Sequence, residues 1–424
     1  MPPARCERPA AAASPRTAPR RTAQLRGRAG SSRAKDRLKR GVNQATQPVV
    51  AFDKTRFFGI ALAGPKHPSP VPASPHSPPS QLQQAIAALA DRRSLSELQT
   101  TAAFGVVMRG EATPAQIAAL LMGLRVKGET AEEVAGAARA LRDAMVRVEA
   151  NGAHLVDTCG TGGGVVSTFN ISTAAAFVAA GAGAVVAKHG NRSFTSRCGS
   201  ADVLEALGVR ISLDAADAAR VLREACLTFL FAPTFHPAMK YAGPVRRELA
   251  VASVMNLLGP LANPAGVRRQ VVGVADADRA PLMAGALARL GAEHALVVHG
   301  RIGMDEIAPQ GITDVWEVQN GRVNAWEVDP ADHGLAIDDV AGLSGAEPRA
   351  NAARIERLLG DGPDDPAGRA ALLLNAGAAI YVAGLVASYA DGVARAREAV
   401  RAGRARDALE RLRRATNAVP TKRG

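Results

Sequence analysis

The sequence has few aromatic residues and no long apolar run. Aromatic side chains make up 4% of the 424 residues, although hydrophobic residues reach 47%. Alanine dominates the apolar residues, which is typical of closely packed helices rather than of an aromatic-rich β-sandwich. No uninterrupted apolar stretch reaches the roughly 18 residues that a membrane-spanning helix needs, so we predict no membrane span.

Cysteine is equally scarce. The four cysteines, Cys6, Cys159, Cys198 and Cys226, include no C-x-x-C pair, and no cluster of histidines accompanies them. This spacing favours neither a structural zinc site nor a disulfide framework. A reducing compartment is the simplest interpretation, and we therefore predict a cytoplasmic protein.

Positive charge is concentrated at one end of the chain. Residues 1–80 carry 15 Lys or Arg and 3 Asp or Glu, which accounts for most of the net charge of +13. Residues 81–424 carry 37 basic and 36 acidic side chains, so they lack the excess positive charge of a nucleic-acid-binding face. Nucleic acid is therefore not a predicted partner of residues 81–424, although the basic segment could bind it weakly and without sequence preference.

The basic segment 1–80 is rich in Arg, Ala, Pro and Ser, and ends in the proline-rich stretch 68–79. Such a composition cannot bury enough apolar surface to offset the entropy of ordering, so we predict a disordered leader. Three interpretations of this leader stay open: a dispensable extension, such as one produced by a start codon assigned too far upstream, an organelle transit peptide, or a basic arm.

From Gln81 onward, apolar residues recur at helical spacing. Thr113-Pro114 and Thr130 are typical helix starts, with a hydroxyl cap followed by Pro or by acidic residues. The predicted helices are 81–91, 95–109, 114–126 and 130–149, and the stretch 237–262 is also predicted to be helical. We therefore expect a small helical domain at 81–150 and about 237–262.

Beyond Gly152, short apolar strands alternate with helices. The predicted strands are 154–158, 184–188, 270–275, 294–298 and 314–318, and the first helices between them are 170–181 and 200–207. This alternation is typical of an α/β fold with a mainly parallel central sheet. We expect the larger domain to span 151–236 and 263–415, with a tail at 416–424.

A glycine-rich loop follows the first predicted strand. Residues 157–164 read D-T-C-G-T-G-G-G and precede a helix that we expect to begin near Asn170. A helix N-terminus attracts anions, and glycine lets the backbone approach them. However, the loop lacks the lysine of a P-loop, and Val165 stands where the dinucleotide fingerprint needs glycine. Spacing alone thus leaves phosphate binding and a plain tight turn as equal alternatives.

A further polar cluster follows the second predicted strand. The segment K-H-G-N-R at 188–192 offers Lys188 and Arg192 to phosphate oxygens, unless it is simply a solvated loop. Farther along, Ser200 suits the N-cap of a helix. Because the carboxyl ends of parallel strands share one edge of the sheet, we expect this cluster beside the glycine-rich loop.

Acidic and basic pairs complete the set of candidate residues. Asp305 and Glu306 follow the strand 294–298, and adjacent carboxylates beside phosphate-binding loops suit Mg²⁺. Arg246 or Arg247 could clamp a carboxylate in bidentate fashion. Either pair could instead be ordinary surface charge.

Taken together, these segments resemble the anthranilate phosphoribosyltransferases over about residues 81–412. The motifs are G-E-A-T-P-A-Q-I-A-A-L-L-M-G-L-R-V-K-G-E-T at 110–130, T-F-N-I-S-T-A-A-A-F-V-A-A-G-A-G at 168–183, K-H-G-N-R at 188–192, G-S-A-D-V-L-E-A-L-G-V at 199–209, N-L-L-G-P-L-A-N-P at 256–264 and D-E-I-A-P at 305–309. The resemblance implies an α/β fold of the nucleoside phosphorylase and phosphoribosyltransferase type. It also implies an active site between the two domains and a homodimer formed through the helical domain.

The resemblance also implies an activity and the roles of particular residues. Members of this family use Mg²⁺ to transfer phosphoribose from 5-phosphoribosyl-1-pyrophosphate (PRPP) to the amine of anthranilate, in tryptophan biosynthesis. The implied PRPP-binding residues are Gly160, Gly162, Gly163, Gly164, Thr168, Asn170, Ile171, Ser172, Thr173, Lys188, His189, Gly190, Asn191, Arg192, Ser193, Phe194, Thr195, Ser196 and Ser200. The implied anthranilate contacts are Gly160, Asn191 and Arg246, and the implied Mg²⁺ ligands are Ser172, Asp305 and Glu306. No covalent nucleophile or general base is assigned.

Some positions depart from the family pattern. Gly164 and Val165 stand where G-T-G-G-D-G is usual, and Ile302 replaces the Asp of H-G-R-D-G. In the segment that usually reads L-G-x-R-T-x-F-N, the Gly, Arg and Phe are replaced by Ala250, Ala252 and Met255.

Three alternative functions stay open. The first is a relative with a different acceptor. The second, a pyrimidine nucleoside phosphorylase, is disfavoured by Asp305 and Glu306, because phosphorolysis needs no site for a magnesium pyrophosphate complex. The third, a non-catalytic nucleic-acid-binding relative, is disfavoured by the nearly neutral charge of residues 81–424.

Overall fold

The computed structural model describes residues 80–150, 155–193, 197–360, 362 and 365–420. The predicted leader and three predicted PRPP-binding residues, Phe194, Thr195 and Ser196, lie outside the described residues. Within those residues, no helix has both the length and the hydropathy needed to cross a bilayer.

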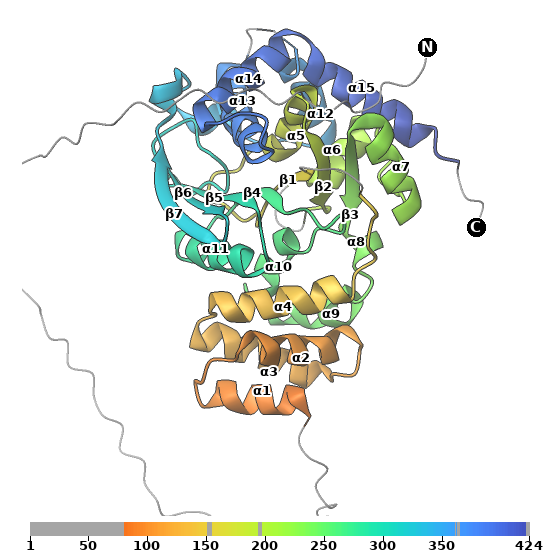
Figure 1. Ribbon diagram of the computed structural model, residues 1–424, viewed down its shortest axis with the longest axis vertical. Coiled ribbons are helices and arrows are strands. Elements are labelled where there is room, and N and C mark those ends of the chain that lie inside the picture. The colour runs from red at the N-terminus through yellow and green to blue at the C-terminus, as the bar shows by residue number, and fades with distance from the viewer. Residues whose placement is uncertain (1–79, 151–154, 194–196, 361, 363–364, 421–424) are drawn as a thin grey trace, which may run out of the picture. The chain divides into compact units, whose positions relative to one another are not determined.

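Four helices form the helical domain at the N-terminal end of the described chain (Figure 1). They are α1 Gln81–Ala90, α2 Glu97–Met108, α3 Pro114–Lys127 and α4 Ala131–Asp143. Each begins with a capping box, in which the cap hydroxyl and the side chain three residues later satisfy each other's backbone N–H groups. The cap residues are Ser80, Ser96, Thr113 and Thr130, so the predicted starts at Thr113 and Thr130 are confirmed.

The last of these helices is shorter than predicted. Helix α4 ends at Asp143, whereas the apolar spacing predicted a helix to residue 149. The backbone N–H of Val146 donates to the Phe235 carbonyl at 2.8 Å, and that of Val148 donates to the Pro264 carbonyl at 3.0 Å. Contacts with distant backbone groups therefore replace the helical hydrogen bonds in this stretch.

Seven strands form one sheet in the order β3-β2-β1-β4-β5-β6-β7. Strands β1 to β5 are parallel, whereas β6 and β7 pair in antiparallel fashion, so the predicted mainly parallel sheet is confirmed. The predictions missed β3 and β7. The strands are β1 Leu155–Gly160, β2 Val185–Gly190, β3 Leu227–Phe231, β4 Arg269–Gly273, β5 His294–Gly300, β6 Thr313–Gln319 and β7 Arg322–Val328.

Helices surround the sheet and connect its strands (Figure 1). The N-cap of α6 is Gly199 rather than the predicted Ser200, because the Asp202 carboxylate accepts the Gly199 N–H at 2.8 Å. The predicted tail is partly helical, since α15 ends at Asn417. The helices are α5 Ile171–Gly181, α6 Ser200–Ala206, α7 Ala215–Ala225, α8 Ala232–Phe235, α9 Met239–Leu249, α10 Met255–Leu261, α11 Ala280–Arg289, α12 Pro348–Leu358, α13 Pro366–Val382, α14 Tyr389–Arg401 and α15 Arg404–Asn417, with short 3₁₀ turns η1 Ala277–Arg279, η2 Pro330–His333 and η3 Val340–Leu343.

The two faces of the sheet belong to different hydrophobic cores. In β4 and β5, successive side chains point to opposite faces, as the pleat of a strand requires. Val271 and Leu296 enter the core that contains α5, α13, α14 and α15. Val272 and Val297 enter a second core, which α11 shares with the helical domain and with α9 and α10. The helical domain therefore packs through the same apolar cluster as one face of the sheet.

The turn after α9 holds an alanine in the left-handed conformation. Ala250 has φ 52° and ends the helix, and its N–H donates to the Arg246 carbonyl at 3.2 Å. The left-handed region costs an L-residue roughly 1–2 kcal/mol, whereas glycine adopts it freely. The family pattern has glycine at this position, so this chain retains a strained helix end.

We expect Ala250→Gly to increase the free energy of unfolding by about 0.5–1 kcal/mol. The relief of strain outweighs the greater flexibility that glycine gives the unfolded chain, which costs roughly 0.4–1 kcal/mol. Urea denaturation of the full chain measures the change. Ala402→Gly serves as the control, because Ala402 ends α14 at φ −80° and its replacement relieves no strain. Equal effects of the two substitutions would contradict this explanation.

Candidate active site

Four of the five parallel strands end on glycine at one edge of the sheet: Gly160, Gly190, Gly273 and Gly300. Gly160 lies opposite Gly273 in the pairing of β1 with β4. A Cβ atom on Gly273 would lie 1.7 Å from the carbonyl oxygen of Asp305, and one on Gly160 would lie 2.9 Å from its Oδ2. The absence of these two side chains leaves the space that the Asp305 segment occupies.

The glycine-rich loop is attached to this same segment. Gly162 donates its N–H to Asp305 Oδ2 at 2.9 Å, and Val165 donates its N–H to the Gly303 carbonyl at 2.9 Å. Gly162 and Gly163 have φ values of 67° and 83°, which glycine adopts without strain. Apart from their chain neighbours, no described residue has an atom within 4 Å of a Cβ built on either of them. This open space beside bare backbone suits a ligand that approaches the backbone closely.

The family departures in this region lie around Asp305. A Cβ on Gly164 would lie 3.3 Å from Asp305 Oδ1, so the acid usual at this position would add a carboxylate beside Asp305. Val165 is 90% exposed, and Ile302 packs against the larger core. The loop of this chain therefore carries less negative charge than the family pattern prescribes.

The two predicted metal-binding carboxylates lie between the glycine-rich loop and the start of α5. Glu306 Oε1 accepts the backbone N–H of Ser172 at 3.2 Å. Burial raises the pKa of Asp305, and burial together with the charge of Asp305 raises the pKa of Glu306 to about 8, although Lys188 opposes this rise. Both carboxylates are thus costly to ionise without a compensating cation.

This pair of carboxylates fits a Mg²⁺ ion. Within the residues that the structure describes, no group of three or more His, Cys, Asp and Glu side chains could hold a metal. Mg²⁺ needs only one or two protein carboxylates, because water and substrate phosphates complete its octahedron. Asp305 and Glu306 would supply those carboxylates, and the Ser172 hydroxyl is the third predicted ligand.

Lys188 lies beneath the start of α5. Its side chain is buried, and its Nζ donates to the Thr158 carbonyl and, at 3.3 Å, to the Ser172 hydroxyl. Its positive charge opposes the rise in pKa that burial causes in Asp157 and Glu306. Lys188 thus adds a fixed positive charge to the N-terminal end of the helix, where the helix dipole already favours anions.

The side chain of His189 makes a structural contact. Its Nδ1 lies 3.2 Å from the Gly259 carbonyl, so Nδ1 carries the proton and Nε2 accepts from His236 Nε2 at 3.2 Å. Burial lowers the pKa of His189 to about 3 and that of His236 to about 4. This neutral pair joins β2 to α10 and to the residue that follows α8.

Arg192 is paired with acidic side chains of α6. Its guanidinium donates to Asp202 at 2.7 Å and to both oxygens of Glu205 at 2.7 and 2.9 Å. Ser200 donates its hydroxyl to the Asn191 carbonyl at 3.2 Å. The predicted phosphate contact of Arg192 would therefore compete with two carboxylates.

Arg246 differs from Arg192 in having no such partner. It lies on α9 and is partly buried, and this burial lowers its pKa. Among the described residues, no acceptor pairs with its guanidinium, whereas its neighbour Arg247 is exposed to solvent. Arg246 is thus a desolvated positive charge available to an anionic ligand.

Sequence reasoning missed three residues that support this site. Gly273 makes room for Asp305, Asn375 of α13 exchanges two hydrogen bonds of 2.9 Å with the backbone of Ile307, and Asn351 of α12 contacts the start of α5. The signals were present but weak. Gly273 ends an apolar strand, and a glycine there indicates close approach of another backbone segment. Asn375 interrupts an apolar helical run, and a polar residue there indicates a buried hydrogen bond.

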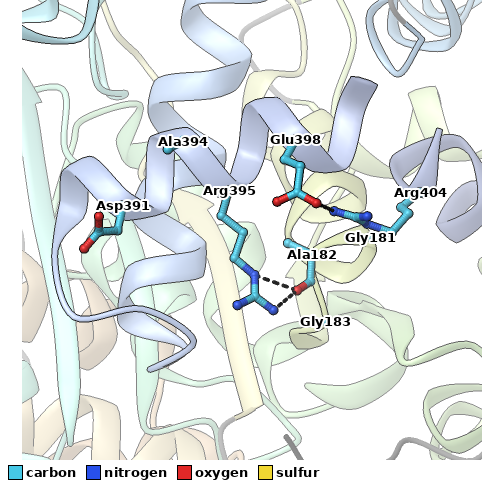
Figure 2. A pocket seen from close by; sticks show the side chains of 8 residues that line it. All are labelled: Gly181, Ala182, Gly183, Asp391, Ala394, Arg395, Glu398 and Arg404. Carbon is cyan, nitrogen blue, oxygen red and sulfur yellow. Dashed lines mark hydrogen bonds and ion pairs between the residues drawn. The ribbon is translucent and has the colours of Figure 1, made fainter. Parts of the chain in front are cut away.

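A separate depression of about 630 Å³ lies where the end of α5 meets α14 (Figure 2). Figure 2 shows Arg395 turned towards the Ala182 carbonyl, to which it donates at 2.7 and 3.1 Å. Arg404 pairs with Glu398 at 2.9 Å. Because both arginines that line the depression already have partners, it offers no unpaired basic side chain to an anionic ligand.

The fold and the site together define a two-domain transferase that handles phosphorylated substrates. Residues 83–145 match the helical bundle domain of a glycosyl transferase family, and residues 152–406 match its a/b domain. The chain belongs to the anthranilate phosphoribosyltransferase family of these enzymes, as the sequence motifs predicted.

Curated relatives and solved structures support this assignment. The anthranilate phosphoribosyltransferase of Herpetosiphon aurantiacus is 47% identical over 338 residues, which cover 80% of this chain and 99% of the relative. That of Rubrobacter xylanophilus is 51% identical over 331 residues, covering 78% and 96%. The crystal structure of the Thermus thermophilus enzyme superposes with a TM-score of 0.75 at 42% identity, covering 79% of this chain and 99% of that one. The Saccharomyces cerevisiae enzyme in complex with PRPP and Mg superposes with a TM-score of 0.73 at 26% identity, covering 80% and 98%.

Proposed function

We propose that the chain transfers the phosphoribosyl group of PRPP to the amine of anthranilate, giving N-(5-phosphoribosyl)anthranilate and pyrophosphate in L-tryptophan biosynthesis. One observation carries this proposal: at a single sheet edge, the glycine-rich loop and the start of α5 both hydrogen-bond to the adjacent carboxylates Asp305 and Glu306. Bare backbone, a helix N-terminus and paired acids suit a pyrophosphate bound with a divalent cation.

The site residues supply positive potential where the leaving group develops charge. Departure of pyrophosphate leaves negative charge on its oxygen and positive charge on the ribose ring. Lys188, the N-terminus of α5 and the backbone N–H groups of Gly163 and Gly164 would stabilise the negative charge. When bound, Mg²⁺ would neutralise part of the pyrophosphate charge, with Asp305, Glu306 and the Ser172 hydroxyl as its protein ligands.

The acceptor is held by separate residues. We assign the carboxylate of anthranilate to the Arg246 guanidinium, because this partly buried charge has no partner among the described residues. Asn191 and Gly160 would contact the remainder of the anthranilate molecule. The aromatic amine is already a usable nucleophile, so the main contribution of these contacts is to hold it close to the ribose carbon.

We further propose that the chain forms a homodimer through its helical domain. Leu98 on α2 is 81% exposed and Val126 on α3 is 72% exposed. Both side chains lie on the helical domain, through which the family resemblance implies that the dimer forms, and apolar surface exposed there supports this proposal.

The activity is tested with the full chain, anthranilate, PRPP and MgCl₂. We expect the fluorescence of anthranilate to fall as the product forms, and EDTA to stop the fall. A second reaction supplies uridine or thymidine with inorganic phosphate, and we expect no free base to form. A flat anthranilate trace from folded protein would contradict the proposed function, and release of the base would favour the phosphorylase alternative.

A further inference from the structure

A buried asparagine outside every motif touches the start of α5. Asn351 lies on α12 and is 2% exposed. Its Oδ1 accepts the backbone N–H of Ala346 at 2.9 Å, and its Nδ2 donates to Asn170 Oδ1 at 3.1 Å. Asn170 is the N-cap residue of α5, 181 positions earlier in the chain. Two side-chain amides thus join α12 to the helix that begins in the proposed PRPP site.

Two backbone groups fix the direction of these hydrogen bonds. The Ala346 N–H can only donate, so Asn351 must turn its oxygen to Ala346 and its nitrogen to Asn170. At the other end, the Cys198 carbonyl can only accept, and Asn170 donates its Nδ2 to it at 3.0 Å. Asn170 must therefore turn its oxygen to Asn351. Neither amide can be reversed without bringing two donors or two acceptors together.

The Asn170 side chain does not cap its own helix. An N-cap asparagine commonly accepts the backbone N–H two or three residues later, yet the Asn170 side chain makes no such bond. Its oxygen is used by Asn351, and one Nδ2 proton is used by the Cys198 carbonyl. The second Nδ2 proton is the donor that the Asn170 side chain can still offer to a substrate oxygen.

The surroundings of Asn351 also hold the backbone that leads into α5. The Leu343 carbonyl accepts the Phe169 N–H at 2.9 Å. The Arg354 guanidinium lies 4.3 Å from the centre of the Phe169 ring, in a cation–π contact. A Cβ atom on Gly345 would lie 2.4 Å from the Thr168 carbonyl oxygen, so the two segments touch directly. The backbone and the Asn170 side chain are therefore fixed by the same part of the chain.

We propose that Asn351 is a positioning residue for PRPP, which orients the Asn170 amide so that its second proton points to the donor substrate. This inference rests on the proposed function, because it takes Asn170 as a PRPP contact. Asn351 itself touches no reacting atom. It acts through Asn170 and through the contact that Asn170 makes with the Cys198 segment.

Asn351→Asp changes this polarity with almost no change in size. The nitrogen that faces Asn170 becomes an oxygen, so with an ionised carboxylate two acceptors meet unless Asn170 reverses, and the titrations are therefore run at about pH 8, where the carboxylate is favoured over the protonated form. If Asn170 reverses, its oxygen faces the Cys198 carbonyl, which is again a pair of acceptors. Asn351→Ser is a milder second variant, because it removes the amide nitrogen without adding a charge. Ile355→Val is the matched control, since Ile355 is a fully buried residue of the same helix without a polar side chain.

The decisive measurement is the affinity for PRPP in the presence of Mg²⁺ and the absence of anthranilate, by isothermal titration calorimetry of the full chain. We expect Asn351→Asp to raise the Kd by about 10-fold and Asn351→Ser by about 3-fold to 10-fold, as the misplacement of one hydrogen bond to a charged ligand should. The KM for anthranilate should stay within about 2-fold of the parent chain. Ile355→Val should lower the melting temperature by a few degrees and leave the Kd unchanged.

Several outcomes would overturn this inference. An unchanged Kd in folded Asn351 variants, an equal rise in the KM of both substrates, or an equal loss of affinity in Ile355→Val would each show a merely structural role. If Asn351→Asp does not fold, as judged by near-ultraviolet circular dichroism, Asn351→Ser decides. A failure of the proposed function is distinguishable, because the parent chain itself would then bind no PRPP.

Discussion

Gly273→Ala is expected to lower kcat/KM for the transfer reaction by about 100-fold or more. The new Cβ atom would lie 1.7 Å from the Asp305 carbonyl oxygen, so the segment that carries Asp305 and Glu306 must move. A displacement of roughly 1 Å at a reacting centre can cost about 100-fold in rate. Because the substitution removes neither carboxylate and only displaces them, the variant separates the effect of their position from that of their charge.

Steady-state rates across a MgCl₂ titration test this expectation. We expect the variant to need more Mg²⁺ for half-maximal activity, and its maximal rate to stay low at saturation. Gly259→Ala is the control, because a Cβ on Gly259 meets no atom within 4 Å. If the two variants were equally active, the strand-end glycine would have no part in placing the carboxylates.

Arg246→Ala is expected to raise the KM for anthranilate by roughly 10-fold to 100-fold. A hydrogen bond to a charged group contributes about 1.5–3 kcal/mol, and this guanidinium is partly desolvated before any ligand arrives. The KM for PRPP should change by less than about 3-fold, because Arg246 is assigned to the acceptor alone.

Arg247→Ala is the matched control, since Arg247 is adjacent and exposed. Aniline, which lacks the carboxylate, gives a second comparison. The parent chain should prefer anthranilate strongly, whereas Arg246→Ala should lose most of that preference. Equal changes in the KM of PRPP and of anthranilate would remove the assignment of Arg246 to the carboxylate.

Much of the fold could be predicted because local signals agreed with tertiary structure. Thr113 marks the start of α3 in the sequence, and Glu133 lies in the acidic first turn that marks the start of α4. Both residues belong to capping boxes in the structure. Strand β3 was missed because it begins directly after α7, with only Cys226 in the left-handed conformation between them. Strand β7 is largely exposed, so it lacks the apolar alternation that reveals a half-buried strand.

The candidate site residues that could be predicted from the sequence are those that belong to short motifs beside predicted strands. Gly162 and Asp305 follow the ends of β1 and β5, and Lys188 lies near the end of β2, so parallel topology brings all three to one edge. Asn351 and Gly273 act on residues that are distant in sequence, and no periodicity connects them. The pairing of Arg192 with acidic residues of α6 was missed for another reason. A cluster of basic residues that suits a phosphate does not show which carboxylates already pair with those residues.

The glycines at the strand ends have a consequence for redesigning the enzyme. Where a binding surface is made of main chain, amino-acid replacement can obstruct it but cannot give it a new preference. In the proposed site, the glycine-rich loop would meet PRPP in this way, whereas the acceptor would depend on the long, replaceable side chain of Arg246. Acceptor specificity and donor specificity are therefore expected to change through substitutions at different positions. New acceptors should be sought by varying α9 and its neighbours, with the strand ends left untouched.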